Sequence, residues 1–286
     1  MAFDPDKAVK SFHSLRKSLK AVPKQPSPTQ VHELRTRTRR VEALVHALTI
    51  GHKKEAGLLL DAVTPIRKKA GDTRDIDVVI GLTAAIPIEC EQECLVELIE
   101  HLGSKRVKSI RKLRKTLAAQ RRKAKLRLKQ ASHLLRKYSR SSRKNAKESQ
   151  EWSADVTAAA VEIWSELRSW PRLNSTNLHR FRIQAKELRY ILQLSTENSG
   201  EFLRTLGEVK DAIGEWHDWD ELAAIAAGVL KHGSRCPVVK QMRSTAKQKF
   251  DHALLVANTM RSTYRDGNLD WTRMLNGNGD STRKLT

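Results

Sequence analysis

Hydrophobic residues recur three and four positions apart along most of the chain, which is the spacing of one face of an α-helix. Near the amino terminus, Asp4 and Pro5 form a helix start, and four apolar residues follow on one face: Val9, Phe12, Leu15 and Leu19. The same spacing predicts helices over residues 4–21, 31–50, 53–69, 75–85, 89–102, 104–138, 150–170, 177–198, 200–214, 217–232 and 237–265. No segment alternates polar and apolar residues between turn signals, as a strand would. The sequence therefore predicts an all-α fold.

Polar segments suggest how the chain is divided. The stretch S-R-S-S-R-K-N-A-K-E-S at residues 139–149 is predicted to link two halves, residues 4–138 and 150–265. The end of the chain, N-G-N-G-D-S-T-R-K-L-T at residues 276–286, has the turn and polar content of a disordered tail. The folded part is therefore expected within residues 1–275.

An internal repeat supports the two halves. The segment V-H-E-L-R-T-R-T-R-R-V-E-A-L at residues 31–44 can be aligned with L-H-R-F-R-I-Q-A-K-E-L-R-Y-I at residues 178–191. Downstream, A-G-D-T-R-D-I-D-V at 70–78 aligns with I-G-E-W-H-D-W-D-E at 213–221. The matched pairs are His32 with His179, Arg35 with Arg182, Arg39 with Lys186, Gly71 with Gly214, Asp75 with Asp218, and Asp77 with Asp220. Two blocks in the same order at nearly the same offset indicate a duplicated helical unit.

The charge of the chain indicates the kind of partner that these helices bind. The chain has 286 residues, with 54 Lys and Arg against 32 Asp and Glu, a formal net charge of +22 and a pI near 10.2. Such a field favours an anionic partner. On a helical wheel the cations of both repeated helices lie opposite the apolar face, and the acids stand at its margins as Glu33, Glu42 and Glu187. An ordinary solvated face interleaves acids throughout, so these stripes favour a bound polyanion over simple exposure to solvent.

The most basic segment lies between the two repeats. From His101 to Lys147 there are nineteen Lys and Arg residues and no Asp or Glu. Apolar residues at helical spacing indicate that this segment packs as a helix, and its cations can neutralise successive phosphates. Its candidate contacts are Lys108, Arg111, Lys115 and Arg122. Because Tyr138 is the one aromatic residue here, and single-strand binders stack bases on aromatics, a partner without bases fits better.

The acids and histidines do not form a recognisable catalytic or metal motif. An Asp-x-Asp pair on a helix directs its carboxylates about 200° apart, and no phosphate-cradling glycine loop or nucleophile motif accompanies it. Gly71 and Gly214 are expected to end helices, and Asp75 and Asp218 to lie near helix starts, capping N–H groups or pairing with stripe arginines. Two histidines, His32 and His179, stand among cations that disfavour their charged form, which suits hydrogen bonding to phosphate. No cofactor, metal site or catalytic residue is expected.

The expected compartment is the cytoplasm. The three cysteines, Cys90, Cys94 and Cys236, match neither a disulfide framework nor a zinc spacing, so they are expected to be reduced and packed as small apolar residues. The amino terminus lacks an apolar signal core, and no run approaches the ~18 apolar residues of a membrane span. A membrane surface is also disfavoured, because the stripes lack an opposing set of Trp or Phe residues.

The motifs resemble a known family. Helices H-E-L-R-T-R-T-R-R and H-R-F-R-I-Q-A-K-E-L-R-Y, followed by G-D-T-R-D-I-D-V and G-E-W-H-D-W-D, are similar to the conserved histidine α-helical domain, the CHAD family, over residues 5–265. The resemblance implies two pseudo-symmetric antiparallel four-helix bundles around a basic central cavity, and binding of inorganic polyphosphate. Some members lie on polyphosphate granules. By position, the resemblance assigns the cavity lining to His32, Arg35, Arg39, Arg40, His179, Arg182, Lys186 and Arg189.

Two departures from the repeat concern the second half. Glu187 stands at the position of Arg40, and His217 at that of Arg74, so the second half is expected to bind more weakly. Some relatives carry a triphosphate-processing domain before this one, for which this chain has no room, so binding without catalysis is expected. The leading hypothesis is a cytoplasmic polyphosphate-binding protein. The alternative is a non-specific nucleic-acid-binding protein, and chain length preference and oligomeric state stay open.

Overall fold

The computed structural model describes residues 4–48, 53–87, 92–142, 146–194 and 200–264, with side chains of 53 and 138–155 excepted. Regular structure in these residues is helical, which confirms the all-α prediction. The helices are α1 (Pro5–Ala21), α2 (Pro28–Ala47), α3 (Lys53–Ala84), α4 (Gln92–Ser142), α5 (Ala146–Ser169), α6 (Leu178–Leu192), α7 (Gly200–Val229), the 3₁₀ turn η1 (Gly233–Arg235) and α8 (Pro237–Thr263).

The first two helices begin where their sequences provide caps. The Asp4 carboxylate accepts hydrogen bonds from the backbone N–H groups of Asp6 and Lys7, as the amino-terminal pattern predicts. At α2, Ser27 and Gln30 form a reciprocal capping box, and Pro28 occupies the first turn. The basic helix therefore starts three residues before its predicted start at residue 31.

Several predicted helix breaks are wrong. Gly71 lies inside α3, Gly103 inside α4 and Gly214 inside α7, so three long helices replace six shorter ones. An interior glycine costs about 1 kcal/mol of helix propensity, which tertiary packing along a long amphipathic helix outweighs. The ends of α4 and α5 also extend into the predicted linker 139–149, of which residues 143–145 lie outside the described part. The predicted tail 276–286 lies outside it as well.

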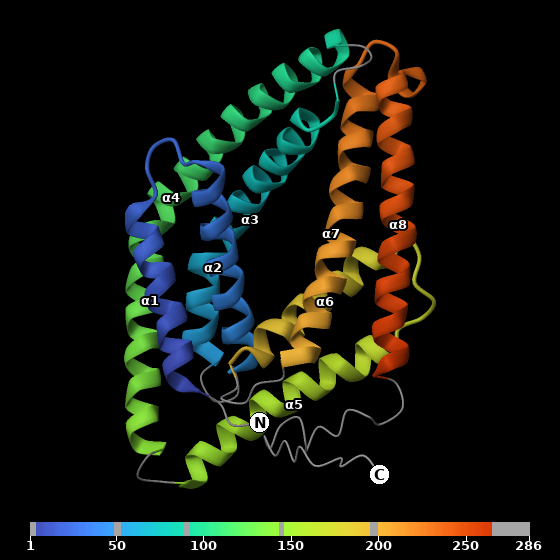
Figure 1. Cartoon of the computed structure of the whole chain (residues 1–286). Helices are drawn as coiled ribbons and strands as arrows, with labels where there is room; N and C mark the ends of the chain where they lie inside the picture. Colours follow the sequence, from blue (N-terminus) through green and yellow to red (C-terminus); the bar gives the residue numbers. More distant parts are fainter. Residues whose placement is uncertain (1–3, 49–52, 88–91, 143–145, 195–199, 265–286) are drawn as a thin grey trace, which may run out of the picture.

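The helices pack in two halves that contact each other (Figure 1). In the first half, α1 packs on α2, α2 on α3, α3 on α4, and α4 returns to α1, which closes a four-helix bundle. In the second half, α5 packs on α6, α6 on α7 and α7 on α8. Between the halves, α2 contacts α6 and α3 contacts α7, so the repeated helices meet their own counterparts.

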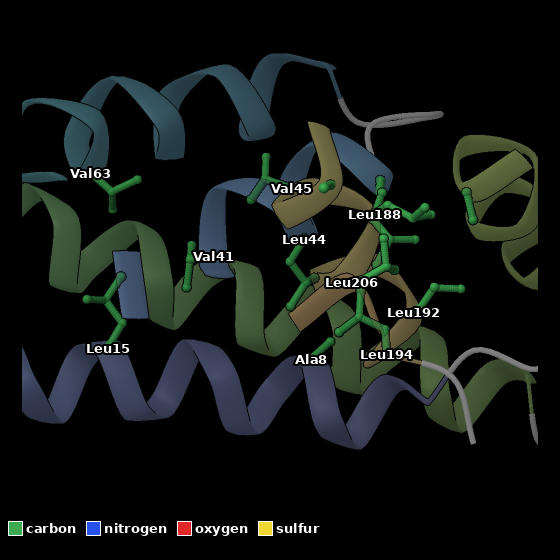
Figure 2. Packing of buried hydrophobic residues seen from close by; sticks show 14 of the residues in the cluster. Ala8, Leu15, Val41, Leu44, Val45, Val63, Leu188, Leu192, Leu194 and Leu206 are labelled. Carbon is green, nitrogen blue, oxygen red and sulfur yellow. The ribbon is translucent and has the colours of Figure 1, made fainter. Parts of the chain in front are cut away.

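Buried apolar residues join the halves at two places. One core runs through both halves and brings Leu15 and Leu44 of the first together with Leu188 and Leu206 of the second (Figure 2). A second cluster joins the α3–α4 tip to the α7–α8 tip, where Cys94 Sγ and Cys236 Sγ lie 3.8 Å apart. Sequence reasoning treated these two cysteines separately. The two clusters hold α2 and α3 opposite α6 and α7 along the stretch between them.

Candidate functional site

A cavity of about 410 Å³ lies between the two halves, and its walls are α2, α3, α6 and α7. The repeated helices α2 and α6 supply the residues that the stripes predict. All eight line this cavity: His32, Arg35, Arg39, Arg40, His179, Arg182, Lys186 and Arg189. Because apolar residues on the opposite faces, such as Leu34 and Phe181, are buried in the core, each stripe is turned toward the other half.

The four candidate residues of the most basic segment lie elsewhere. Arg111, Lys115 and Arg122 of α4 line a separate groove, and Lys108 is exposed on the same helix. None of them is among the residues that line the cavity, and α4 packs mainly on α3 and α1. These four candidate contacts therefore lie outside the cavity.

Sequence reasoning did not assign several residues to the cavity lining: Arg74 of α3 and Lys210, His217 and Tyr190 of the second half. The repeat pairs Arg74 with His217, directly before Asp75 and Asp218, and that pairing could have assigned both to the lining. With them, the lining holds eight Arg or Lys side chains and four carboxylates. Its formal charge is therefore +4 when the histidines are neutral.

Each half contributes four of the eight cations. The first half supplies Arg35, Arg39, Arg40 and Arg74, and the second supplies Arg182, Lys186, Arg189 and Lys210. Glu187, the acid that replaces Arg40 in the repeat, lines a neighbouring hollow and not this cavity. The two departures seen in the sequence therefore leave the charge contributed by arginine and lysine equal in the two halves.

The marginal acids neutralise cations outside the cavity. Glu33 pairs with Arg37 at 2.9 Å on the same helix, and Glu42 pairs with Arg67 of α3 at 2.6 Å. Neither acid lines the cavity. The composition of α2 therefore overstates how many carboxylates lie beside the stripe cations on the cavity side.

Two arginines of the second half are held in place by backbone carbonyl groups. Arg182 Nε donates a hydrogen bond to the carbonyl oxygen of Lys210 at 3.0 Å, and Arg189 Nε donates to that of Leu203 at 3.4 Å. In the first half, Arg35 pairs with Asp75 at 3.3 Å. A carbonyl partner orients a guanidinium without cancelling its charge, so these bonds leave the second-half arginines able to bind an anion.

One of the two repeated glycines makes room for a cavity arginine. A Cβ atom at Gly214 would overlap Arg182 Nη2 and lie 3.0 Å from its Cζ, whereas one at Gly71 would lie 3.6 Å from Arg35 Nε. Both glycines sit in helix interiors, which corrects the prediction that they end helices. Gly214 is therefore needed for the close approach of the arginine to α7.

The paired aspartates separate as the helix geometry predicts. Asp75 lines the cavity, while Asp77 is buried and pairs with Arg106 of α4 at 2.5 Å. Asp75 and Asp218 lie in the middle of α3 and α7, so the prediction that they lie near helix starts is wrong, and the predicted pairing with a stripe arginine is confirmed for Asp75. Within the described residues, His, Cys, Asp and Glu side chains form no cluster of three or more with metal-binding geometry.

Comparison with known proteins identifies this arrangement. A profile of the CHAD domain matches residues 8–227, which is more than half of the chain. The chain belongs to the CHAD domain family. The crystal structure of the CHAD domain from the plant Ricinus communis is similar, with a TM-score of 0.57 and 15% sequence identity over 95% of this chain and 91% of that chain. No curated protein sequence matches the chain.

Two of the three histidines that line this CHAD cavity have lowered pKa values. Desolvation, followed by His217 and Arg182, lowers the pKa of His179 to about 4. Desolvation, Arg74 and Arg35 lower the pKa of His32. The His179 and His217 rings lie 4.5 Å apart between centroids, and Asp218, whose Oδ1 lies 3.9 Å from His217 Nδ1, raises the pKa of His217. His32 and His179 are therefore neutral at pH 7, as the sequence predicts, and each can donate one N–H to a ligand.

Crowding of cations also affects side chains that are ordinarily always charged. Lys186 is 8% exposed, and desolvation together with Arg182, Arg39 and Arg35 lowers its pKa to about 6. Desolvation and Arg35 lower the pKa of Arg39 to about 10. Each shift means that the empty CHAD cavity disfavours its own positive charges. An anion among them would reverse that effect.

Among the described helices, none has an apolar stretch sufficient to cross a bilayer.

Proposed function

We propose that this CHAD protein binds inorganic polyphosphate in the cavity between its halves and does so without catalysing a reaction. The observation that carries the proposal is the convergence of eight cations from two repeated helix pairs on one cavity that holds only four carboxylates. Ammonium and guanidinium groups form strong charge-assisted hydrogen bonds to phosphate oxygens. The link between the CHAD family and polyphosphate supports the same ligand.

The lining favours a phosphate chain over nucleic acid. Tyr190 is the one Phe, Tyr or Trp side chain among the residues that line the cavity. Proteins that hold single strands without sequence preference stack bases on several aromatics placed among the cations. A cavity of about 410 Å³ with one such ring has cations for phosphates and little surface for bases.

The acids of the cavity support binding rather than phosphoryl transfer. Asp75 is paired with Arg35 at 3.3 Å, and Glu215 is paired with Lys249 of α8 at 2.8 Å. Phosphoryl transfer depends on metal ions or positioned bases that act on the reacting phosphorus. Asp75 pairs with a cavity cation and positions it, whereas Glu215 pairs with a lysine that does not line the cavity. A protein that holds polyphosphate in this way is expected on polyphosphate granules.

A competition titration tests the proposal. Labelled long-chain polyphosphate bound to the protein at near-physiological salt is challenged with unlabelled polyphosphate, single-stranded RNA and duplex DNA at equal phosphate concentration. Polyphosphate is expected to displace the label and the nucleic acids are expected to compete much less. Equal competition by nucleic acid would make the protein a general polyanion binder, and release of phosphate on adding magnesium would show an enzyme.

The role of Gly214 gives a prediction with a matched control. Gly214→Ala is expected to weaken polyphosphate binding about threefold to tenfold, because Cβ displaces the Arg182 guanidinium and its bond to the Lys210 carbonyl, about 1 kcal/mol. Gly71→Ala has space for its Cβ and is expected to change affinity less than about twofold.

Both variants replace an interior helical glycine, so both gain helix propensity of about 1 kcal/mol. Thermal unfolding followed by circular dichroism, together with anisotropy titrations of labelled polyphosphate, separates stability from binding. Equal affinities for the two variants would mean that the position of Arg182 does not matter for the ligand.

A further inference from the structure

The groove on α4 is a second cationic surface, which we call the α4 trough. It has a volume of about 710 Å³ and lies between α4 and the connection from α1 to α2. Its lining contains seven cations and no acid: Lys24, Arg111, Arg114, Lys115, Arg121, Arg122 and Lys125. The trough is thus larger than the central cavity and, unlike it, has no carboxylate in its wall.

The cations of the trough are arranged along a rigid helix. They follow one side of α4 from Arg111 to Lys125, over a length of about 21 Å at 1.5 Å per residue, and the lining has no cation between Lys115 and Arg121. The opposite side of this stretch is fixed, because Leu113, Ala124 and Leu128 are buried in the core of the first half. The row of charges is therefore held in place before any ligand arrives, which lowers the entropic cost of binding.

The trough cations are also uncompensated. Within the described residues, no carboxylate forms an ion pair with any of the seven, whereas Arg106 on the same helix is paired with Asp77. Arg121 Nη2 donates to the carbonyl oxygen of Val22 at 3.3 Å, and its Nε is buried without a hydrogen-bond partner in the described structure. Like charges one turn apart repel each other, so a bound anion would relieve the repulsion and satisfy open donors.

The trough and the cavity are separate sites. They share no lining residue, and no residue of α4 lines the cavity. The trough lining also lacks Phe, Tyr, Trp and His, which favours a phosphate chain over bases. Resting on the function proposed above, we infer that the α4 trough is a second polyphosphate site, and that long chains link several protein molecules by occupying the cavity of one and the trough of another.

The inference predicts a stoichiometry of two. Calorimetric titration of the full chain with tripolyphosphate at low salt is expected to saturate at two equivalents. A trough variant carrying Arg111→Gln, Lys115→Gln, Arg122→Gln and Lys125→Gln is expected to bind one equivalent, because glutamine keeps the helix propensity and removes the charge. Long-chain polyphosphate is expected to produce strong light scattering with the natural protein and little with this variant, since one site cannot cross-link.

A matched control separates the site from net charge. Lys112→Gln, Lys123→Gln, Lys129→Gln and Arg136→Gln remove four exposed cations of the same helix outside the trough, and this variant is expected to keep two equivalents and the scattering. One equivalent for the natural protein, or identical behaviour of trough and control variants, would overturn the inference and leave the cavity proposal intact. If single-stranded RNA at equal phosphate concentration displaces the tripolyphosphate bound in the trough, the trough is a nucleic-acid site and the inference is overturned too. If the trough variant loses all binding, the proposed cavity site fails, and the inference of two sites fails with it.

Discussion

Removing four cavity cations is expected to weaken polyphosphate binding at least about a hundredfold, in a variant that carries Arg35→Ala, Arg39→Ala, Arg182→Ala and Lys186→Ala. A hydrogen bond to a charged group contributes about 1.5–3 kcal/mol, so even strongly non-additive losses exceed the roughly 2.7 kcal/mol that a hundredfold change requires. Fewer cations also release fewer counterions on binding. The slope of log affinity against log salt concentration is expected to fall by about 3.

The measurement is a series of anisotropy titrations with labelled long-chain polyphosphate at several salt concentrations. The variant of Lys112, Lys123, Lys129 and Arg136 serves again as control, because it loses the same charge outside both sites. Helix content should hold or rise in the cavity variant, since alanine favours helix and the repulsion between Arg35, Arg39 and Lys186 disappears. Unchanged affinity together with an unchanged salt slope would place the main site on α4 and contradict the proposed function.

Sequence could predict the two facing stripes because helical periodicity determines which residues share a face. Once Leu34 and Phe181 face the core, Arg35 and Arg182 must face away from it, and the repeat implies that both copies do the same. Arg74 was named only as the counterpart of His217, and Lys210 was not named, because each stands on a helix without a cationic stripe. Their place in the cavity depends on which helices meet between the halves, and that is a tertiary fact.

The sequence could not predict that α4 lies away from the cavity, for the same reason. The periodicity shows that Leu113 and Leu128 pack inward, but not which neighbours they meet, so the cations on the other face could not be assigned to a site. The two interior glycines led to a wrong prediction of helix ends for a different reason. Gly71 and Gly214 look like helix ends by local propensity, yet Gly214 is explained by contact with an arginine that lies 32 residues earlier in the chain.

Polyphosphate binding is expected to take up a proton at Lys186. In the empty protein its pKa is about 6, because burial and three arginines disfavour the ammonium form, so most molecules carry a neutral amine at pH 7. A phosphate chain in the cavity replaces that repulsion with attraction and raises the pKa. Affinity should therefore rise as pH falls from 8 to 6, by up to about tenfold per pH unit, and level off below pH 6.

The folding equilibrium has the opposite dependence. The unfolded chain holds the Lys186 proton up to its ordinary pKa of 10.5, so between pH 6 and that value it binds one proton more than the empty folded protein. Stability of the ligand-free protein consequently rises with pH over this window. Lys186→Met keeps the apolar stem and removes the buried amine, so it should stabilise the empty protein by on the order of 2 kcal/mol at pH 7 while weakening polyphosphate binding.

Calorimetry of polyphosphate binding in buffers of different ionisation enthalpy measures the proton directly. Long chains are preferred for this titration because their few end groups contribute little. The natural protein should take up close to one proton more than Lys186→Met at pH 7, and the difference isolates Lys186 from His32, His179 and His217, which also line the cavity.

Lys210→Met is the control: it removes a cavity cation paired with Asp211, so it should weaken binding yet keep the pH dependence. A pH dependence that survives in Lys186→Met would assign the proton to the histidines. If Lys186 does take it up, the side chain whose ammonium form the empty fold disfavours becomes a charged contact in the bound protein.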